Sequence, residues 1–224
     1  AAAAPEALRE RIRDAGLVGM GGAAFPTHVK LSPPPDKPID VLILNGAECE
    51  PYLTADHRLM LENPGEILAG AAMLAAILKV REVWIGIEEN KPDAVRTLSA
   101  RAAEFGVKIA PLRVRYPQGA EKQLIYALTG RKVPAGGLPM DVGCVVQNVG
   151  TAAAAAAAVL RGEPLIERVT SITGRPVAQP GNWRLRIGTP LARALELAGG
   201  ITDQPAKVVF GGPMMGLAVC SLEV

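Results

Sequence analysis

Apolar residues recur at helical spacing along several stretches of the chain. In residues 5–15, Leu8 and Ile12 fall on one face of a helix. Asn63 followed by proline is typical of a helix start, because asparagine caps the first turn and proline fits into it. The pattern predicts helices over residues 5–15, 64–78, 92–105, 121–129 and 151–160, and a short helix from about residue 27.

Short apolar runs bounded by turn residues alternate with these helices. Residues 41–44, 83–87 and 142–146 are apolar or glycine at almost every position, which is typical of strands buried on both faces of a sheet. Residues 107–115 are expected to be extended. Strands that alternate with helices predict an α/β fold, a Rossmann-like three-layer arrangement with a mostly parallel sheet.

The pattern changes after residues 163–164. Residues 169–173, 183–187 and 208–210 are predicted to be short strands separated by turns, with a single helix over about 191–197 among them. This is an α+β arrangement. It predicts a domain boundary near residue 165, with domains over residues 1–165 and 166–224.

Composition and charge narrow the range of functions. A formal net charge of +2 over 224 residues gives no electrostatic basis for binding nucleic acid. The cysteines, Cys49, Cys144 and Cys220, are scattered without a CxxC pair, so no disulfide framework and no zinc or iron–sulfur site is expected within this chain. No signal-peptide pattern is visible. The longest apolar run, residues 67–78, is too short to span a bilayer and predicts a core helix.

A glycine-rich segment precedes the short helix predicted near residue 27. Gly19, Gly21 and Gly22 let the backbone approach a ligand closely, and the amides of such a loop form an anion site together with a helix amino end. Lys30 adds a positive charge one turn later. The segment is neither a Walker loop nor the dinucleotide fingerprint GxGxxG, because Ala24 stands in place of the last glycine. A tight turn between two helices is the alternative interpretation.

Five sequence blocks, in order along the chain, resemble one family of flavoproteins. The block GGAAFPTHVK at residues 21–30 resembles the flavin loop GxGGAGFPTxxK of the complex I flavoprotein subunit, and still more the GxGGAxFPTHVKL of the C subunit of the Rnf complex. The other blocks that resemble this C subunit are NGAECEPY at 45–52, YPQGAEK at 116–122 (with Ala120 replacing a glycine), QNVGT at 147–151 and GGPMMG at 211–216.

The resemblance implies a fold, an activity and partners. It implies an FMN- and NADH-binding domain followed by a small β-grasp module of the soluble-ligand-binding (SLBB) type. Hydride would be exchanged between NAD(H) and FMN, and electrons passed to or from iron–sulfur centres of an Rnf-type NADH:ferredoxin oxidoreductase. The partners would be NADH and the other subunits of this membrane-bound complex. The chain itself would have no transmembrane segment and would be cytoplasmic, attached peripherally to the inner membrane. The family's 4Fe-4S clusters belong to a C-terminal ferredoxin-like domain without a counterpart here, so none is expected in this chain.

The matching blocks also indicate which residues bind the cofactors. No catalytic acid or base is expected, because the chemistry of hydride transfer belongs to the cofactor, and no metal ligand is expected. The residues expected to contact FMN or NAD(H) are Gly19, Gly21, Gly22, Ala23, Phe25, Lys30, Asn45, Glu48, Glu50, Tyr116, Gly119, Glu121, Asn148 and Thr151.

Several of these residues also have simpler structural explanations. Asn45 follows a buried strand, where α/β sheets bind ligands. Glu48 and Glu50 are two residues apart and would point the same way in an extended loop. The site interpretation is favoured for Glu48, whereas Glu50 is equally explained as a solvated carboxylate. Glu121 is expected to hold ribose hydroxyls, to stabilise the start of its own helix, or to do both. Thr151 is expected either to cap its helix or to bind the FMN phosphate.

Three other functions remain open on the sequence alone. Cobalamin reductases of bacterial microcompartments share the same core. A non-catalytic scaffold that has lost flavin is disfavoured, because Asn45, Glu48, Asn148 and Thr151 are intact. A Rossmann dehydrogenase with an organic substrate is disfavoured by the absent fingerprint and by the absence of a recognisable general base.

Overall fold

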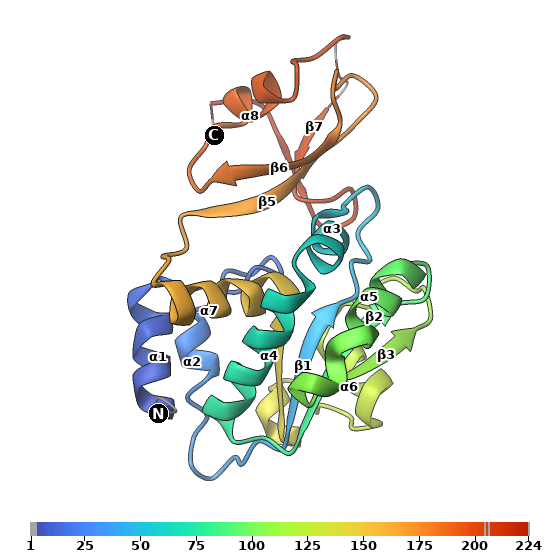
Figure 1. The fold of residues 1–224 in the computed structure, drawn as a ribbon. Coiled ribbons are helices and arrows are strands. Elements are labelled where there is room, and N and C mark those ends of the chain that lie inside the picture. The colour runs from blue at the N-terminus through green and yellow to red at the C-terminus, as the bar shows by residue number, and fades with distance from the viewer. Residues whose placement is uncertain (1–3, 204, 206, 224) are drawn as a thin grey trace. The chain divides into compact units, whose positions relative to one another are not determined.

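The structure of the chain, a computed structural model, describes residues 4–203, 205 and 207–223 (Figure 1). The chain divides into two compact units. The first comprises Ala1–Cys49 and Leu59–Leu165, and the second comprises Glu50–Arg58 and Ile166–Val224. The chain therefore leaves the first unit after Cys49 and returns to it at Leu59.

The first unit is built on a four-stranded parallel sheet. Its strand order is β3-β2-β1-β4, so β1 lies in the interior and β4 at an edge. Asn45 on β1 is in register with Gly86 on β2 and with Asn148 on β4. The carboxyl ends of these three strands therefore lie side by side at one end of the sheet. The strands are β1 (Val41–Gly46), β2 (Glu82–Glu88), β3 (Lys108–Leu112) and β4 (Cys144–Asn148).

Helices cover both faces of this sheet, which confirms the predicted three-layer α/β fold (Figure 1). On one face, buried side chains of α1, α4, α5 and α7 form a core with Leu42 and Leu44 of β1. On the other face, Leu124 and Ile125 of α6 pack with Ile43. The helices are α1 (Pro5–Asp14), α2 (Thr27–Lys30), α3 (Ala55–Glu62), α4 (Pro64–Leu78), α5 (Pro92–Ala102), α6 (Glu121–Thr129) and α7 (Val149–Arg161), with 3-10 turns η1 (Ala103–Phe105) and η2 (Pro139–Val142).

The predicted elements agree with the structure apart from shifted ends and three missed elements. The strand predicted over residues 142–146 starts two residues later, because η2 continues to Val142 and is followed by Gly143, which has a positive φ of 72°. Asn45, expected to follow its strand, is the penultimate residue of β1, and Asn148 is the last residue of β4. Helix α3, the 3-10 turn η2 and strand β8 (Leu217–Val219) were not predicted. Helix α3 buries only Met60, so its sequence carries a weak periodic signal.

The alanine-rich helix α7 packs closely against α4. Five of its alanines are buried, and at Gly70 of α4 an added Cβ would lie 1.8 Å from the carbonyl oxygen of Ala152. Two helix backbones approach this closely only where the side chains between them are very small. The alanine run is therefore a packing surface as well as a good helix former.

None of the described helices is by itself long and apolar enough to cross a membrane. Helices α3 and α4 reach the required length and composition only when taken together, and they are bent by 94° between them.

The second unit has the predicted α+β composition. Strands β5 (Glu167–Ile172) and β6 (Gly181–Arg186) pair in antiparallel fashion, as do β7 (Val208–Phe210) and β8 (Leu217–Val219). Helix α8 (Leu191–Leu197) contributes Ala194 to a small core with Ile172 and Leu185. Residues 50–58 join this unit through Thr54, whose backbone N–H donates to the Ser171 hydroxyl at 3.0 Å.

An ion pair at the amino end of β1 makes the stability of the first unit depend on pH. Arg131 donates two hydrogen bonds to the Asp40 carboxylate, at 2.6 and 2.7 Å, and another to the carbonyl oxygen of Val142 at 2.8 Å. The hydrogen bonds from Arg131 hold the pKa of Asp40 below its ordinary value of 3.8. The pair is partly exposed, so its contribution to stability is modest.

We expect Asp40→Asn to lose this pH-dependent contribution. The wild type should exceed the variant in free energy of unfolding by up to about 1 kcal/mol at neutral pH. Because the folded-state pKa is lowered, the difference should be complete above pH 4 or so and should disappear as pH falls through that lowered pKa. Urea unfolding of both proteins between pH 7 and the acid limit measures the difference. If the difference in unfolding free energy between the two proteins does not change with pH, the Asp40–Arg131 pair is not the source of the pH dependence.

Candidate functional site

The glycine-rich segment forms a tight loop before α2. Its two ends are joined by backbone hydrogen bonds from Gly19 N–H to Phe25 O at 2.8 Å and from Thr27 N–H to Leu17 O at 3.0 Å. Gly22 has φ of +121°, a conformation that side chains rarely adopt, and a Cβ there would meet nothing within 4 Å. The loop geometry therefore requires glycine at this position, and that side of the loop is open.

This loop lies against the amino end of α7. The backbone N–H of Met20 donates to the hydroxyl of Thr151 at 2.9 Å, and Thr151 is completely buried. A Cβ on Gly21 would lie 3.6 Å from Cβ of Asn148. The amino end of a helix is electropositive, so the loop and the helix together create an environment suited to an anion.

The helix α7 is capped by Asn148. Its side-chain oxygen accepts a hydrogen bond from the N–H of Gly150 at 2.7 Å. The expectation that Thr151 caps the helix is wrong, since Thr151 lies within the first turn and its hydroxyl accepts from the Met20 N–H. Thr151 therefore joins the glycine-rich loop to the helix.

We expect Thr151→Val to destabilise the protein by about 1–2 kcal/mol, because valine has the same shape but leaves the Met20 N–H without this acceptor. Thr151→Ser is the control: it keeps the hydroxyl and should lose only the contribution of one methyl group, about 0.8 kcal/mol. Urea unfolding compares the variants. If valine proves less disruptive than serine, the hydrogen bond does not hold the loop.

Lys30 and Glu121 form an ion pair. The ammonium of Lys30 lies 2.6 Å from a carboxylate oxygen of Glu121 and donates a second hydrogen bond to the carbonyl oxygen of Val146 at 3.0 Å. Both side chains are about one-third exposed. The sequence indicated separate roles for these residues, a phosphate for Lys30 and a ribose or helix start for Glu121. The structure brings them together beside the edge strand β4.

Asn45 forms side-chain hydrogen bonds to the loop that precedes α6 and to the loop that follows β1. Its side-chain amide donates to the carbonyl oxygen of Gly119 at 2.8 Å, and its side-chain oxygen accepts from the N–H of Ala47 at 3.0 Å. A Cβ on Gly119 would lie only 2.5 Å from the carbonyl oxygen of Ala47. Glycine at 119 therefore permits the loop before α6 to pack against the loop after β1.

The two glutamates expected to act together belong to different units. Glu48 lies in the first unit, is half-buried, and its carbonyl oxygen accepts a hydrogen bond from Lys91 at 3.2 Å. Glu50 lies in the second unit, where its carboxylate accepts from the backbone N–H groups of Met214 and Met215 at 3.1 and 2.7 Å. This arrangement favours an anchoring role for Glu50 within the second unit.

The remaining expected residues lie on the surface of the first unit. Phe25 and Tyr116 are 47% and 41% exposed, which is unusual for aromatic rings that serve only as core. Ala23 lies in the turn of the glycine-rich loop. These three residues are accessible to a ligand.

Five buried polar residues of the first unit were not among the predicted site residues: Thr27, Glu88, Lys91, Gln118 and Gln147. The amide nitrogen of Gln147 and the hydroxyl of Thr27 are buried and have no hydrogen-bond partner among the described residues. Glu88 and Lys91 are buried and form an ion pair at the carboxyl end of β2. The sequence offered a signal for Gln147 and Glu88. Each lies at the carboxyl end of an apolar strand segment, the same kind of position that led to the prediction of Asn45.

The described residues offer no metal site. Groups of three or more histidine, cysteine, aspartate or glutamate side chains able to hold an ion are absent from that part of the chain, and Cys49, Cys144 and Cys220 are free thiols. Burial raises the pKa of the Cys144 thiol, which makes it less reactive.

Comparison with known proteins identifies two families along the chain. The sequence profile of the Nuo51 FMN-binding domain matches residues 12–157, and that of the SLBB domain matches residues 169–218. The first match spans most of the first unit and includes residues 50–58 of the second unit. The second match lies within the main segment of the second unit, Ile166–Val224.

Among curated proteins, the chain resembles C subunits of ion-translocating complexes. It is 55% identical over 213 residues to the C subunit of the proton-translocating ferredoxin:NAD(+) oxidoreductase complex of Clostridium ljungdahlii, covering 95% of this chain and 47% of that protein. It is 47% identical to the C subunit of the Na(+)-translocating complex of Acetobacterium woodii, again over 95% of this chain and 48% of the relative. The C subunit of the ion-translocating oxidoreductase complex of Pseudomonas aeruginosa is 48% identical over the whole chain, which spans 29% of it. The chain thus spans about half or less of these relatives.

The fold also resembles that of a solved enzyme. A chain of an NAD+-reducing [NiFe]-hydrogenase in the H2-reduced state superposes with a TM-score of 0.85 at 25% sequence identity, over 98% of this chain and 43% of that chain. The likeness covers nearly every described element.

Proposed function

Since this chain belongs to the Nuo51 FMN-binding domain family, we propose that its first unit binds FMN and exchanges hydride between NAD(H) and that flavin. The chain would serve as the flavin-bearing part of a C subunit in an ion-translocating ferredoxin:NAD(+) oxidoreductase complex. The observation that carries the proposal is the glycine-rich loop held by Thr151 against the amino end of α7. The relatives named as C subunits support the assignment to such a complex.

The residues of the first unit fit FMN. The backbone amides of Gly21, Gly22 and Ala23, with the amino end of α7, would hold the phosphate. Lys30 lies one turn beyond the loop and would add positive charge. Gln147 supports the fit independently, since a buried side-chain amide without a partner is costly unless a ligand completes its hydrogen bonds.

The remaining expected ligands divide between flavin and nucleotide. Asn45 lies near the carboxyl end of β1 and Glu48 follows that strand; both would face the flavin ring, and Asn148 lies at the equivalent end of β4. Exposed Phe25 and Tyr116 offer faces for stacking on a ring of NAD(H). The other members of the proposed ligand set are Gly19, Gly119, Glu121 and Thr151.

FMN, when bound, would accept a hydride from the nicotinamide and release electrons one at a time. The protein has to hold the two cofactors in position and exclude competing reactions. Glu121 would hold ribose hydroxyls with its carboxylate, and it is kept in place at the start of α6 by Lys30. No side chain needs to act as an acid or base in this transfer.

The second unit and the other subunits of the complex would have separate roles. Residues 1–165 would form the FMN- and NADH-binding domain, and residues 166–224 a β-grasp domain that acts as scaffold or interface. Electrons would pass to or from iron–sulfur centres held elsewhere in the complex. Peripheral attachment to the membrane through the other subunits is part of the same proposal.

Titration with FMN followed by visible absorption and fluorescence tests this function. The protein should bind FMN without a covalent link and more than about tenfold more tightly than riboflavin, because one phosphate held by charge-assisted hydrogen bonds contributes at least about 1.5 kcal/mol. Bound FMN should then be bleached by NADH in stopped-flow measurements. Equal affinity for FMN and riboflavin would contradict the phosphate site. Rapid oxidation of the reduced protein by cob(II)alamin would instead favour a cobalamin reductase.

A further inference from the structure

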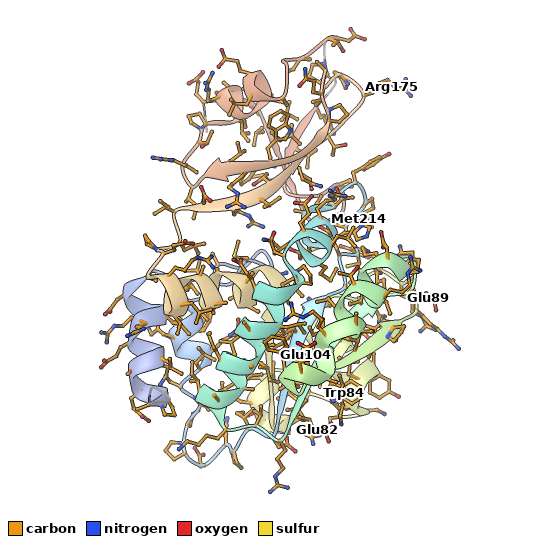
Figure 2. All side chains as sticks on the ribbon, viewed as in Figure 1. Glu82, Trp84, Glu89, Glu104, Arg175 and Met214 are labelled. Carbon is orange, nitrogen blue, oxygen red and sulfur yellow. The ribbon has the colours of Figure 1, made fainter. Side chains whose placement is uncertain are left out.

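A buried ion pair lies at the carboxyl end of β2, and the proposed function does not use it. Glu88 is the last residue of β2, and Lys91 precedes α5. The ammonium of Lys91 lies 2.8 Å from a carboxylate oxygen of Glu88, and the two side chains are only 9% and 2% exposed, respectively. Figure 2 labels the neighbouring Glu89 at this end of β2 and Glu82 at the other end.

The hydrogen bonds of Lys91 show what this pair holds. Besides Glu88, the ammonium donates to the carbonyl oxygen of Glu48 at 3.2 Å and makes a longer contact of 3.4 Å with the side-chain oxygen of Asn90. A lysine has three N–H donors, so these three acceptors account for all of them. Lys91 therefore has no donor left for a ligand, and its bonds join β2 to the loop that follows β1.

Stability does not explain a buried pair of this kind. Removing two charges from water costs about as much as their attraction returns, and a pair of apolar side chains of similar volume is often equally stable. What an apolar pair cannot do is hold a carbonyl oxygen in one place. The carbonyl held here belongs to Glu48, in the same loop as Ala47, whose N–H is held by Asn45.

We propose that Lys91, oriented by Glu88, is a positioning residue for the loop of residues 46–49. By holding the Glu48 carbonyl from the β2 side, it sets the direction of the Glu48 side chain and of the neighbouring backbone groups. Asn45 holds the same loop from within β1. The consequence for ligand binding rests on the proposed function: the positioned loop is the one that meets the isoalloxazine ring of FMN.

The test removes the pair without leaving a buried charge. In the variant Glu88→Met with Lys91→Met, two apolar side chains of similar length replace the pair, so the free energy of unfolding in urea should equal or exceed that of the wild type. Hydrogen–deuterium exchange at the amides of residues 46–49 should nevertheless become faster in the ligand-free protein. The dissociation constant for FMN should rise about tenfold, which corresponds to about 1.4 kcal/mol.

The ion pair between Lys108 and Glu82, at the other end of β2, provides the matched control. Its side chains are 53% and 45% exposed, so Lys108→Met should change neither loop exchange nor FMN affinity. If the double variant does not fold, Glu88→Gln replaces it: this isosteric change loosens the hold on Lys91, and loop exchange should again become faster.

The outcomes separate this proposal from the proposed function. Unchanged exchange in residues 46–49 of the folded double variant, or of Glu88→Gln, would overturn the positioning role whether or not FMN binds. Faster exchange together with a wild-type FMN dissociation constant would overturn the link to the ligand. A wild-type protein that does not bind FMN at all, but whose loop exchange still responds to the substitutions, would refute the proposed function and leave the positioning of the loop standing.

Discussion

Gly22→Val is expected to abolish measurable FMN binding and to leave the protein folded. The position has φ of +121°, outside the range that valine adopts, and a Cβ there projects into open space beside the loop. A branched side chain would keep a ligand away from the loop amides and distort the turn. Loss of at least two charge-assisted hydrogen bonds, each worth about 1.5–3 kcal/mol, would raise the FMN dissociation constant by more than about a hundredfold.

Gly106→Val is the matched control for backbone strain. Gly106 also has a positive φ, +68°, and an added Cβ meets nothing within 4 Å, but it lies at the end of η1, outside the proposed ligand set. Each substitution should cost on the order of 1–3 kcal/mol in unfolding free energy. Only Gly22→Val should affect FMN in a fluorescence titration. Normal FMN affinity in Gly22→Val would exclude the glycine-rich loop as the phosphate site.

Gly70→Ala is expected to destabilise the first unit by on the order of 3 kcal/mol, which is a large part of the stability of a domain. The new Cβ would lie 1.8 Å from the carbonyl oxygen of Ala152 and 2.5 Å from its carbonyl carbon. Both contacts are with backbone, so α4 and α7 have to separate. This cost exceeds the gain of about 1 kcal/mol that alanine brings to a helix in place of glycine.

The consequence of Gly70→Ala should extend to the flavin, because the first turn of the same helix α7 holds Gly150 and Thr151 beside the glycine-rich loop. Gly65→Ala, in the first turn of the same α4, is the control: its Cβ would meet only the flexible end of Arg101 at 3.4 Å, so stability should be unchanged or slightly higher. Urea unfolding and FMN titration of both variants check the expectation. A Gly70→Ala protein as stable as Gly65→Ala would show that the two helices adjust without cost.

Much of the first unit could be predicted because its signals are local. The apolar runs that became β1 and β2, the proline that begins α5 and the glycine that ends α6 act over a few residues of sequence. The glycine-rich loop was also recognisable, since a positive φ at Gly22 is a property of the residue type. Ordered sequence blocks then indicated the family.

Other features could not be predicted because they depend on contacts between distant parts of the chain. The residue that accepts the Met20 N–H is Thr151, 131 positions away, and no local pattern distinguishes this from a helix cap. Similarly, Lys30 and Glu121 are 91 positions apart, and each alone is explained by charge at a helix. Residues 50–58 belong to the second unit through pairs such as Thr54 with Ser171.

The sequence by itself therefore determined the order and type of most elements, the glycine that the loop conformation needs and the family of the chain. Only the tertiary structure decided which polar side chains meet. Lys30 pairs with Glu121. The Glu50 carboxylate accepts hydrogen bonds from the backbone amides of Met214 and Met215. Glu88 and Lys91 form a buried ion pair, from which Lys91 bonds to the carbonyl oxygen of Glu48. The physical reason is that helix and strand preferences arise within a few residues, whereas a hydrogen bond between loops forms only after the sheet has brought its carboxyl ends together.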